Sequence, residues 1–248
     1  ASTIESSARK LFLEKGFAKT SYADIAKACG VEKTNVQKHF PHKDLFIDHF
    51  FEDLLDYSDE FFAKRDMLPD DYYQALYLVG QIHFAFLLST PELRRLTLDI
   101  VSDRKLTEAM ISQDVTWATK YLEGFSLEEQ QTFADNVAVV MGGMYELLYR
   151  KLSTGSPLDP ESFQQLAMNL FVFIQGIPAS DAGELFPPDL LSPDDFAAAI
   201  LTAGQRKQKH GCQHKCKYSF HKLPLYLAER STALRRIVYA GTGQGSCI

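Results

Sequence analysis

The chain has 248 residues, of which 46% are hydrophobic and 23% are charged. This composition supports one large or two small folded domains, and it excludes a disordered tail or a disulfide-stapled miniprotein. No apolar run reaches the roughly eighteen residues that a membrane span needs, and no basic and apolar leader opens the sequence. We therefore expect a soluble, cytoplasmic protein.

The net charge of −6 is the sum of three segments that differ strongly in charge. Residues 1–50 hold 8 basic and 6 acidic residues, residues 51–204 hold 9 and 25, and residues 205–248 hold 9 and 1. The acidic middle segment would repel a polyphosphate, so we expect any nucleic acid to bind at an end of the chain. Cys29 is the single cysteine of the first two hundred residues, which favours a reducing compartment without a disulfide framework.

Helix signals dominate up to about residue 203, because apolar residues recur there every three or four positions. Side chains that can cap helix N-termini mark starts at Ser21, Thr90, Ser126, Asp159 and Ser192. Breaks are expected at Gly16, Gly30, Phe40-Pro41, Leu68-Pro69, Gly124, 153–157 and 176–188. The pattern predicts an all-α fold with about nine helices and no sheet.

Three short helices are predicted in the first forty residues. The first ends at Gly16, and the second runs from Ser21 to Gly30, where glycine can adopt the positive φ of a tight turn. Pro41 limits the third helix to 32–39. This is the outline of a tri-helical helix-turn-helix, although a solvated polar helix in an ordinary bundle is the alternative. The side chains of the third helix that suit a major groove are Lys33, Thr34, Asn35, Gln37 and Lys38.

The spacing of apolar, glycine and polar residues favours the helix-turn-helix. The pattern consists of Ile4, Ala8, Leu11-Phe12, Gly16-Phe17, Thr20-Ser21, Ile25-Ala26, Ala28-Cys29-Gly30-Val31, His39-Phe40 and Lys43-Asp44-Leu45. From Ile4 to Leu45, without a gap, it resembles the DNA-binding domain of TetR-family transcriptional regulators. The length of the helical part and a divergent C-terminal helical domain are also similar to that family.

The resemblance implies roles for the residues at matching positions. Base edges would be contacted by Lys33, Thr34 and Asn35, and phosphates by Thr20 or Ser21, His39 and Lys43. The family usually has an aromatic residue where this chain has Gln37, and Gly or Ala where it has Thr34. The phosphate contact of that aromatic residue is therefore in doubt here, and Gln37 can instead pair with an adenine edge through its amide donor and acceptor.

Two stretches, 131–150 and 163–177, are apolar almost all the way round. One face of the first is formed by Phe133, Val137, Met141, Met144 and Leu148, and another by Ala134, Ala138, Gly142 and Tyr145. A second apolar face needs a cover, so we expect a homodimer through a four-helix bundle, which is also the arrangement that the resemblance implies. Burial of both faces in one monomeric core is the alternative. A two-fold pair would hold its third helices about 34–36 Å apart, which predicts a palindromic operator.

Residues 54–150 contain aromatic and soft side chains that suit a pocket for a hydrophobic or planar effector. For each of them core packing is the plainer role. His83 has no carboxylate three or four positions away, so we expect a hydrogen-bonded core histidine and not a catalytic or metal-binding group. The candidates are Phe61, Tyr73, His83, Phe84, Phe86, Trp117, Tyr121, Met144 and Tyr149.

The composition changes at residue 205 to a basic segment with cysteine and histidine. A Cys-x3-Cys pair within zinc-ligand spacing occurs among His210, Cys212, His214, Cys216 and His221. A second well-spaced pair is missing, since only His221 and the distant Cys247 are left over, so we expect no metal site. We expect a flexible basic tail, which can add salt-sensitive, unspecific affinity for DNA phosphates.

We predict a helix-turn-helix DNA-binding domain at residues 1–46, a helical regulatory and dimerisation domain at 47–203, and a basic tail at 204–248. The expected function is a ligand-responsive transcriptional repressor, and we expect no cofactor. No phosphate loop, nucleophile elbow or metal-binding histidine pair points to catalysis. Two alternatives stay open: an all-helical hydrolase or lyase that uses His83 with Asp99 or Glu146, and a DNA-binding scaffold protein without base preference.

Overall fold

The computed structural model describes residues 2–65, 67, 72–120, 122, 125–177, 194–195 and 197–199. Within these ranges the chain forms helices and turns, and it has no strand, so the predicted all-α fold is confirmed. None of the described helices is long and apolar enough to cross a membrane. Within residues 2–177 the described helices are α1 (Ser2–Lys15), α2 (Tyr22–Cys29), α3 (Lys33–His39), α4 (Leu45–Ala63), α5 (Tyr72–Leu88), α6 (Pro91–Val101), α7 (Arg104–Thr119), α8 (Leu127–Thr154) and α9 (Pro160–Ile174), and residues 194–195 and 197–199 are also helical.

Four of the predicted helix starts are confirmed by their caps. Ser21 and Ser126 form capping boxes, and Thr90 and Asp159 accept hydrogen bonds from backbone N–H groups of the first turn. Ser192 lies outside the described residues. The start of α7 was not predicted, although Asp103 is a capping residue that accepts hydrogen bonds from the backbone N–H groups of Lys105 and Leu106. The stretch that follows Pro91 is therefore divided into α6 and α7, at a point where no break was predicted.

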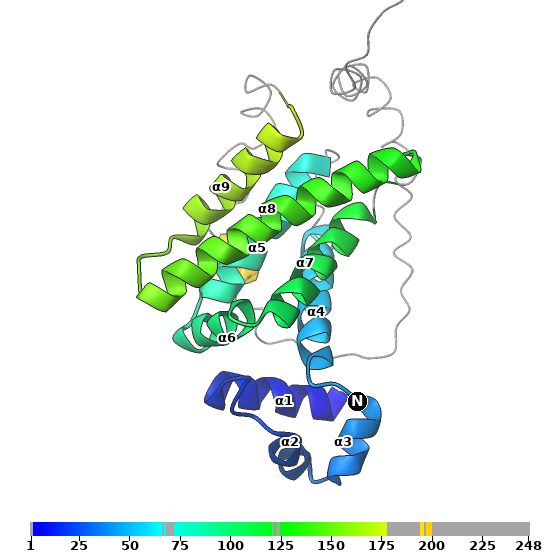
Figure 1. Ribbon diagram of the computed structural model, residues 1–248, viewed down its shortest axis with the longest axis vertical. Helices are drawn as coiled ribbons and strands as arrows, with labels where there is room; N and C mark the ends of the chain where they lie inside the picture. The colour runs from blue at the N-terminus through cyan, green and yellow to red at the C-terminus, as the bar shows by residue number, and fades with distance from the viewer. Residues whose placement is uncertain are drawn as a thin grey trace, which may run out of the picture.

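Helices α1, α2 and α3 pack around a small aromatic core at one end of the molecule (Figure 1). The rings of Phe40 and Phe46 stack with centroids 4.0 Å apart, and Phe12 meets Phe46 edge-on at 5.8 Å. Gly16 and Gly30 adopt φ of 93° and 66°, which L side chains rarely adopt, and they end α1 and α2 as predicted. Sharp turns and a shared core thus hold three short helices together.

Helix α4 continues from this unit into the remaining helices, and the predicted domain boundary at residue 46 falls within it. The two parts also touch through α1 and α6, which lie one above the other in Figure 1. The backbone N–H of Phe17 donates to Asp99 of α6 over 2.9 Å, and Arg95 donates to the carbonyl of Leu13. The N-terminal unit is therefore attached both covalently, through α4, and by hydrogen bonds, through α6.

Helix α5 lies inside the second part and is covered by α4, α6 and α9. The long α8 packs against α6, α7 and α9, and α8 and α9 run side by side (Figure 1). Tyr145 was assigned to the second apolar face of α8, which was expected to need a cover. That assignment is wrong, because Tyr145 is buried within its own subunit. The exposed apolar residues of α8 and α9 are instead Val139, Tyr149, Leu166, Leu170 and Phe173, together with Leu127 at the start of α8.

We predict that Gly30→Ala destabilises the protein by about 1–2 kcal/mol, measured by urea denaturation. An added Cβ at Gly30 would meet nothing within 4 Å, so the cost comes from the positive φ alone. Gly30→Asn is the control, because asparagine adopts this conformation more readily and should lose less stability. Equal losses for the two variants would contradict this explanation.

Candidate nucleic-acid interface and interior pocket

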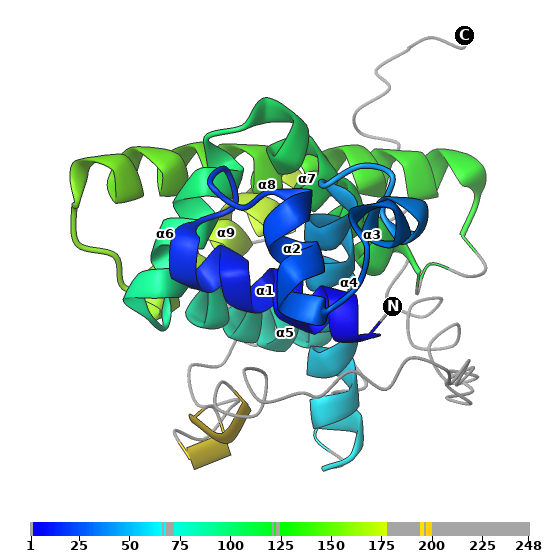
Figure 2. The same cartoon turned by 90° about the horizontal axis from the view of Figure 1, so that it is seen from below.

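Helix α3 lies with α1 and α2 on the side of the molecule that is nearest the viewer in Figure 2, and its polar side chains are exposed. Val36 and Phe40 are buried and one helical turn apart, so they anchor the helix to the aromatic core. All six candidate DNA-binding residues of this helix are exposed: Lys33, Thr34, Asn35, Gln37, Lys38 and His39. The helix is therefore not packed beneath its neighbours, and its hydrogen-bonding side chains are available to a groove.

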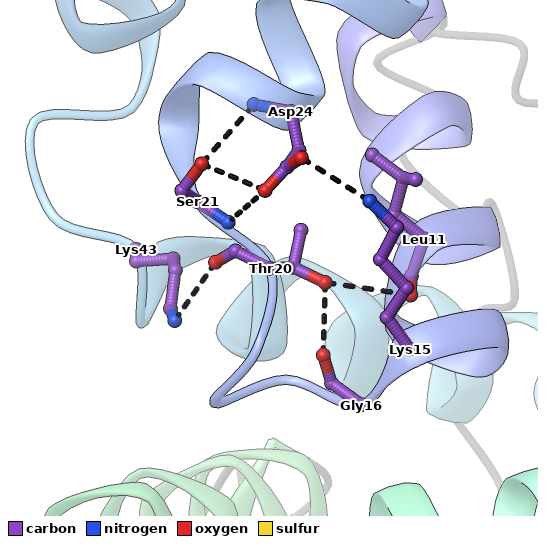
Figure 3. Close-up of polar contacts among 7 residues, drawn as sticks. All are labelled: Leu11, Lys15, Gly16, Thr20, Ser21, Asp24 and Lys43. Carbon is purple, nitrogen blue, oxygen red and sulfur yellow. Dashed lines mark hydrogen bonds and ion pairs between the residues drawn. The ribbon is translucent and has the colours of Figure 1, made fainter.

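Thr20 and Ser21 differ in what they offer to a phosphate (Figure 3). Thr20 is buried, and its hydroxyl donates to the carbonyl of Gly16 over 2.8 Å. Ser21 is exposed and caps α2, where its hydroxyl donates to Asp24 over 2.7 Å. Hydrogen bonds from Ser21, and then from Lys15, lower the pKa of Asp24 to about 2. Of the two candidates, Ser21 is the one whose side chain faces solvent.

Lys43 lies at the turn before α4, and its ammonium contacts the turn between α1 and α2. It donates to the backbone carbonyls of Phe17 and Thr20 over 2.9 and 3.2 Å, and it lies 4.1 Å from the centre of the Phe17 ring. Figure 3 shows the contact with Thr20. Burial lowers the pKa of Lys43. Because an ammonium has three N–H donors, these two carbonyls do not exhaust its capacity to bind a phosphate.

An interior cavity of about 80 Å³ lies in the second part of the molecule, with walls from α4, α5, α7, α8 and α9. Its lining is mostly apolar, and the polar side chains in it are His83, Asp114 and Gln164. Three of the nine predicted pocket residues line this cavity, namely His83, Phe84 and Trp117. The cavity therefore has the composition expected of a site for a small apolar molecule.

The other predicted pocket residues lie elsewhere. Phe61 and Met144 are buried in the core, and Phe86 packs against Phe50 with ring centroids 6.0 Å apart. Tyr73 contacts the ring of Phe171, a lining residue, but does not line the cavity itself. Tyr149 is exposed, and Tyr121 lies outside the described residues.

A chain of buried polar groups runs along one wall of the cavity. The hydroxyl of Tyr145 donates to Asp114 Oδ2, and His83 Nε2 lies 3.1 Å from the same hydroxyl oxygen. Burial lowers the pKa of His83 to about 4 and raises that of Asp114 to about 7. The expectation of a hydrogen-bonded core histidine is confirmed.

The enzyme alternative paired His83 with Asp99 or Glu146, and the structure brings neither of them to it. Asp99 accepts from the backbone of Phe17 on the far side of α6, and the exposed Glu146 pairs with Arg150. No group of three potential metal ligands occurs among the residues that the structure describes. The cysteines and histidines of the tail lie outside those residues.

Gln164 and Asp114 are pocket residues that the sequence analysis missed. A signal for both exists, because each is a polar residue on a stripe that is otherwise apolar. Gln164 shares its stripe on α9 with Ala167, Met168 and Phe171, and Asp114 shares its stripe on α7 with Met110, Trp117 and Ala118. A search for aromatic residues alone passes over such polar positions.

We predict that Asp114→Asn changes the pH dependence of folding stability. Between about pH 4 and 7 the folded state keeps a proton on Asp114 that the unfolded chain releases, so this group lowers stability as the pH rises. His83 acts in the opposite direction between its ordinary pKa of 6.5 and its folded value of about 4. The stability of Asp114→Asn relative to the parent should therefore rise with pH across this window, by up to about 1.4 kcal/mol per pH unit.

Urea denaturation at stepped pH measures this difference. Asp135→Asn on the exposed side of α8 is the control for loss of a surface carboxylate. A stability difference for Asp114→Asn that stays constant with pH would contradict the assignment.

Comparisons with known proteins bear on the N-terminal unit. Residues 4–49 match the family model of bacterial regulatory proteins, tetR family. Among solved structures, the chain is similar to NalD, the secondary repressor of the MexAB-OprM multidrug efflux pump in Pseudomonas aeruginosa. The two are 20% identical, the match covers 68% of this chain and 92% of NalD, and the TM-score is 0.40. No curated protein matches the chain.

The matched segment contains α1, α2, α3 and the start of α4. It is also the unit that holds α3 with its polar face outward, so the family match and the exposed polar side chains mark the same part of the molecule as the candidate interface. Residues 4–49 are therefore similar to the DNA-binding domain of the tetR family of bacterial regulatory proteins.

Proposed function

We propose that this protein is a homodimeric repressor that binds a palindromic operator through α3 and is released when a small molecule occupies the interior cavity. The exposed polar face of α3, anchored by the buried Val36, is the observation that carries the DNA-binding part. The cavity with three buried polar side chains supports the effector part. A scaffold protein would bind DNA without base preference, so competition with random duplex DNA distinguishes the two.

The expected base contacts come from Lys33, Thr34 and Asn35 at the start of α3, with Gln37 one turn further on. The exposed His39 and Lys38, with Ser21 and Lys43 on the flanking turns, can contact phosphates. Thr20 is buried and its backbone N–H donates to the carbonyl of Phe17, so Ser21 is the member of this pair that can contact a phosphate. Side chains that read bases are thus flanked by side chains that position the helix on the duplex.

We predict that Gln37→Ala relaxes base preference at one operator position by about 1–3 kcal/mol, because its amide can pair with an adenine edge. Binding sites selected from random duplexes with the parent and the variant measure this preference. Lys38→Ala is the control and should weaken binding to all sequences about equally. If Gln37→Ala leaves the base preference unchanged at every operator position, the proposed contact of Gln37 with adenine is refuted.

The dimer is expected to form through α8 and α9. Leu166, Leu170 and Phe173 form an exposed stripe along α9, and Phe173 is 81% exposed. Beside it on α8, Val139 is 63% exposed, and a Cβ added at Gly143 would meet nothing within 4 Å. An exposed apolar stripe beside an open helical glycine suits close packing against a second copy of the same two helices.

We predict that Leu170→Glu converts the dimer to a monomer, because it places two carboxylates at the two-fold interface. Analytical ultracentrifugation measures the mass. Leu127→Glu is the matched control, since Leu127 is 84% exposed at the start of α8, away from the stripe, and should leave the mass unchanged. A parent protein that sediments as a monomer would refute the proposed interface.

A route from the cavity to the DNA-binding domain is available through α4 and α6. Leu55 of α4 lines the cavity, and Phe46 at the start of the same helix stacks on Phe40 at the end of α3. Asp99 of α6 holds the backbone N–H of Phe17 at the turn after α1. A ligand that displaces α4, or that shifts α6 through the cavity-lining α5 and α8 against which it packs, would therefore change the spacing of the two α3 helices.

A further inference from the structure

Two buried acceptors in the cavity have no partner among the described residues: His83 Nδ1 and Gln164 Oε1. Both side chains are only 2% exposed. An unpaired buried polar atom costs free energy, and buried polar atoms in folded proteins normally have a partner. Since both residues line the same cavity, a ligand bound there can supply the missing partners.

The hydrogen bonds of Tyr145 determine whether His83 Nδ1 is a donor or an acceptor. Tyr145 has one hydroxyl hydrogen, which it gives to Asp114, so its oxygen accepts from His83 Nε2–H. Burial keeps His83 neutral, and a neutral imidazole carries one N–H. His83 Nδ1 is therefore a lone-pair acceptor when Asp114 is ionised.

The Gln164 amide is oriented by a backbone carbonyl. Its Nε2 donates to the carbonyl of Tyr77 over 3.3 Å. This contact identifies which end of the amide is the nitrogen, so the atom without a partner is the acceptor Oε1. A Cβ added at Gly80 would collide with this amide, so Gln164 lies directly against the Gly80 backbone. His83 follows Gly80 by three residues on the same face of α5, so the Gln164 amide and the His83 imidazole meet α5 about one helical turn apart.

The rest of the cavity limits the size and charge of its occupant. Apolar side chains make up most of the lining, and a charged molecule would lose its hydration there. A dry cavity of about 150 Å³ is known to hold benzene, and this cavity is about 80 Å³. A single ring is therefore the largest occupant to expect, and it requires the cavity to widen, which the flexible side chains of Met141 and Met168 in the lining allow.

We propose that the cavity binds an uncharged single-ring molecule with two hydrogen-bond donors, such as a dihydric phenol, which donate to His83 Nδ1 and Gln164 Oε1. The inference rests on the proposed function of the cavity as the effector site. It goes further by naming the chemical class of the effector and the two atoms that select it.

The test is calorimetric titration of the full chain at pH 8, where Asp114 is ionised, with hydroquinone and with 1,4-dimethoxybenzene. The two probes share a ring, but the ether has no donor. We expect hydroquinone to bind at least tenfold more tightly, because the ether leaves both acceptors unpaired. Benzylamine and benzoate test charged occupants. Equal affinities for the phenol and the ether, tighter binding of a charged probe, or no binding of any probe would overturn the proposal.

Two variants locate the contacts. Gln164→Leu and His83→Phe should each weaken hydroquinone binding about tenfold or more and bring the phenol and the ether closer in affinity. Gln165→Leu, at the next position of α9 and outside the cavity lining, is the matched control and should leave both affinities unchanged. Gln164→Leu should also raise the Tm of the ligand-free protein, since it removes an unpaired buried acceptor; a lower Tm with unchanged hydroquinone affinity would overturn the role of Gln164.

A DNA-binding assay separates this inference from the proposed function. If hydroquinone binds more tightly than the ether and also lowers the affinity of the protein for its operator, the inference about the cavity and the proposed function are both supported. If it binds with that preference but operator affinity is unchanged, the donor selectivity of the cavity stands and the proposed release of DNA fails.

Discussion

The stacking of Phe40 on Phe46 is the contact on which the arrangement of the molecule depends. Phe40 ends α3, and Phe46 lies in the first turn of α4, so this pair fixes the angle at which α3 leaves the body of the protein. Val36, one turn earlier, is buried in the same core. With these two residues buried, the polar residues between and before them must face solvent, since the helical repeat places them on the opposite side.

The same α4 extends from this contact to the cavity, where Leu55 forms part of the wall. The proposed DNA-contacting unit and the proposed effector site therefore share helix α4, and the contact of Asp99 with the backbone of Phe17 adds a second connection between the two parts. Packed cores deform poorly, so a ligand that moves the cavity end of α4 also moves its other end. This makes regulation of DNA binding from the cavity physically reasonable.

The buried polar atoms in the cavity lower stability, and the proposed ligand site gives a reason for their presence. Leucine at Gln164 and phenylalanine at His83 would suit an apolar core better than side chains with unpaired acceptors do. Asp114 is also buried, at a cost that its raised pKa reflects. The unpaired atoms of His83 and Gln164 lower stability because they have no partner in the protein. A ligand that supplies this partner gives a physical reason for polar residues at these positions.

The sequence by itself determined the local structure: the caps at Ser21, Thr90, Ser126 and Asp159, the turns at Gly16 and Gly30, and the exposed polar face of α3. These features depend on neighbouring residues, whose spacing can be read directly. Only the tertiary structure decided which aromatic residues line the cavity, that Tyr145 turns inward to His83 and Asp114, and that Gln164 lies against Gly80. The reason is that these contacts join helices far apart in the chain, and helical periodicity shows that a face is covered but not by which helix.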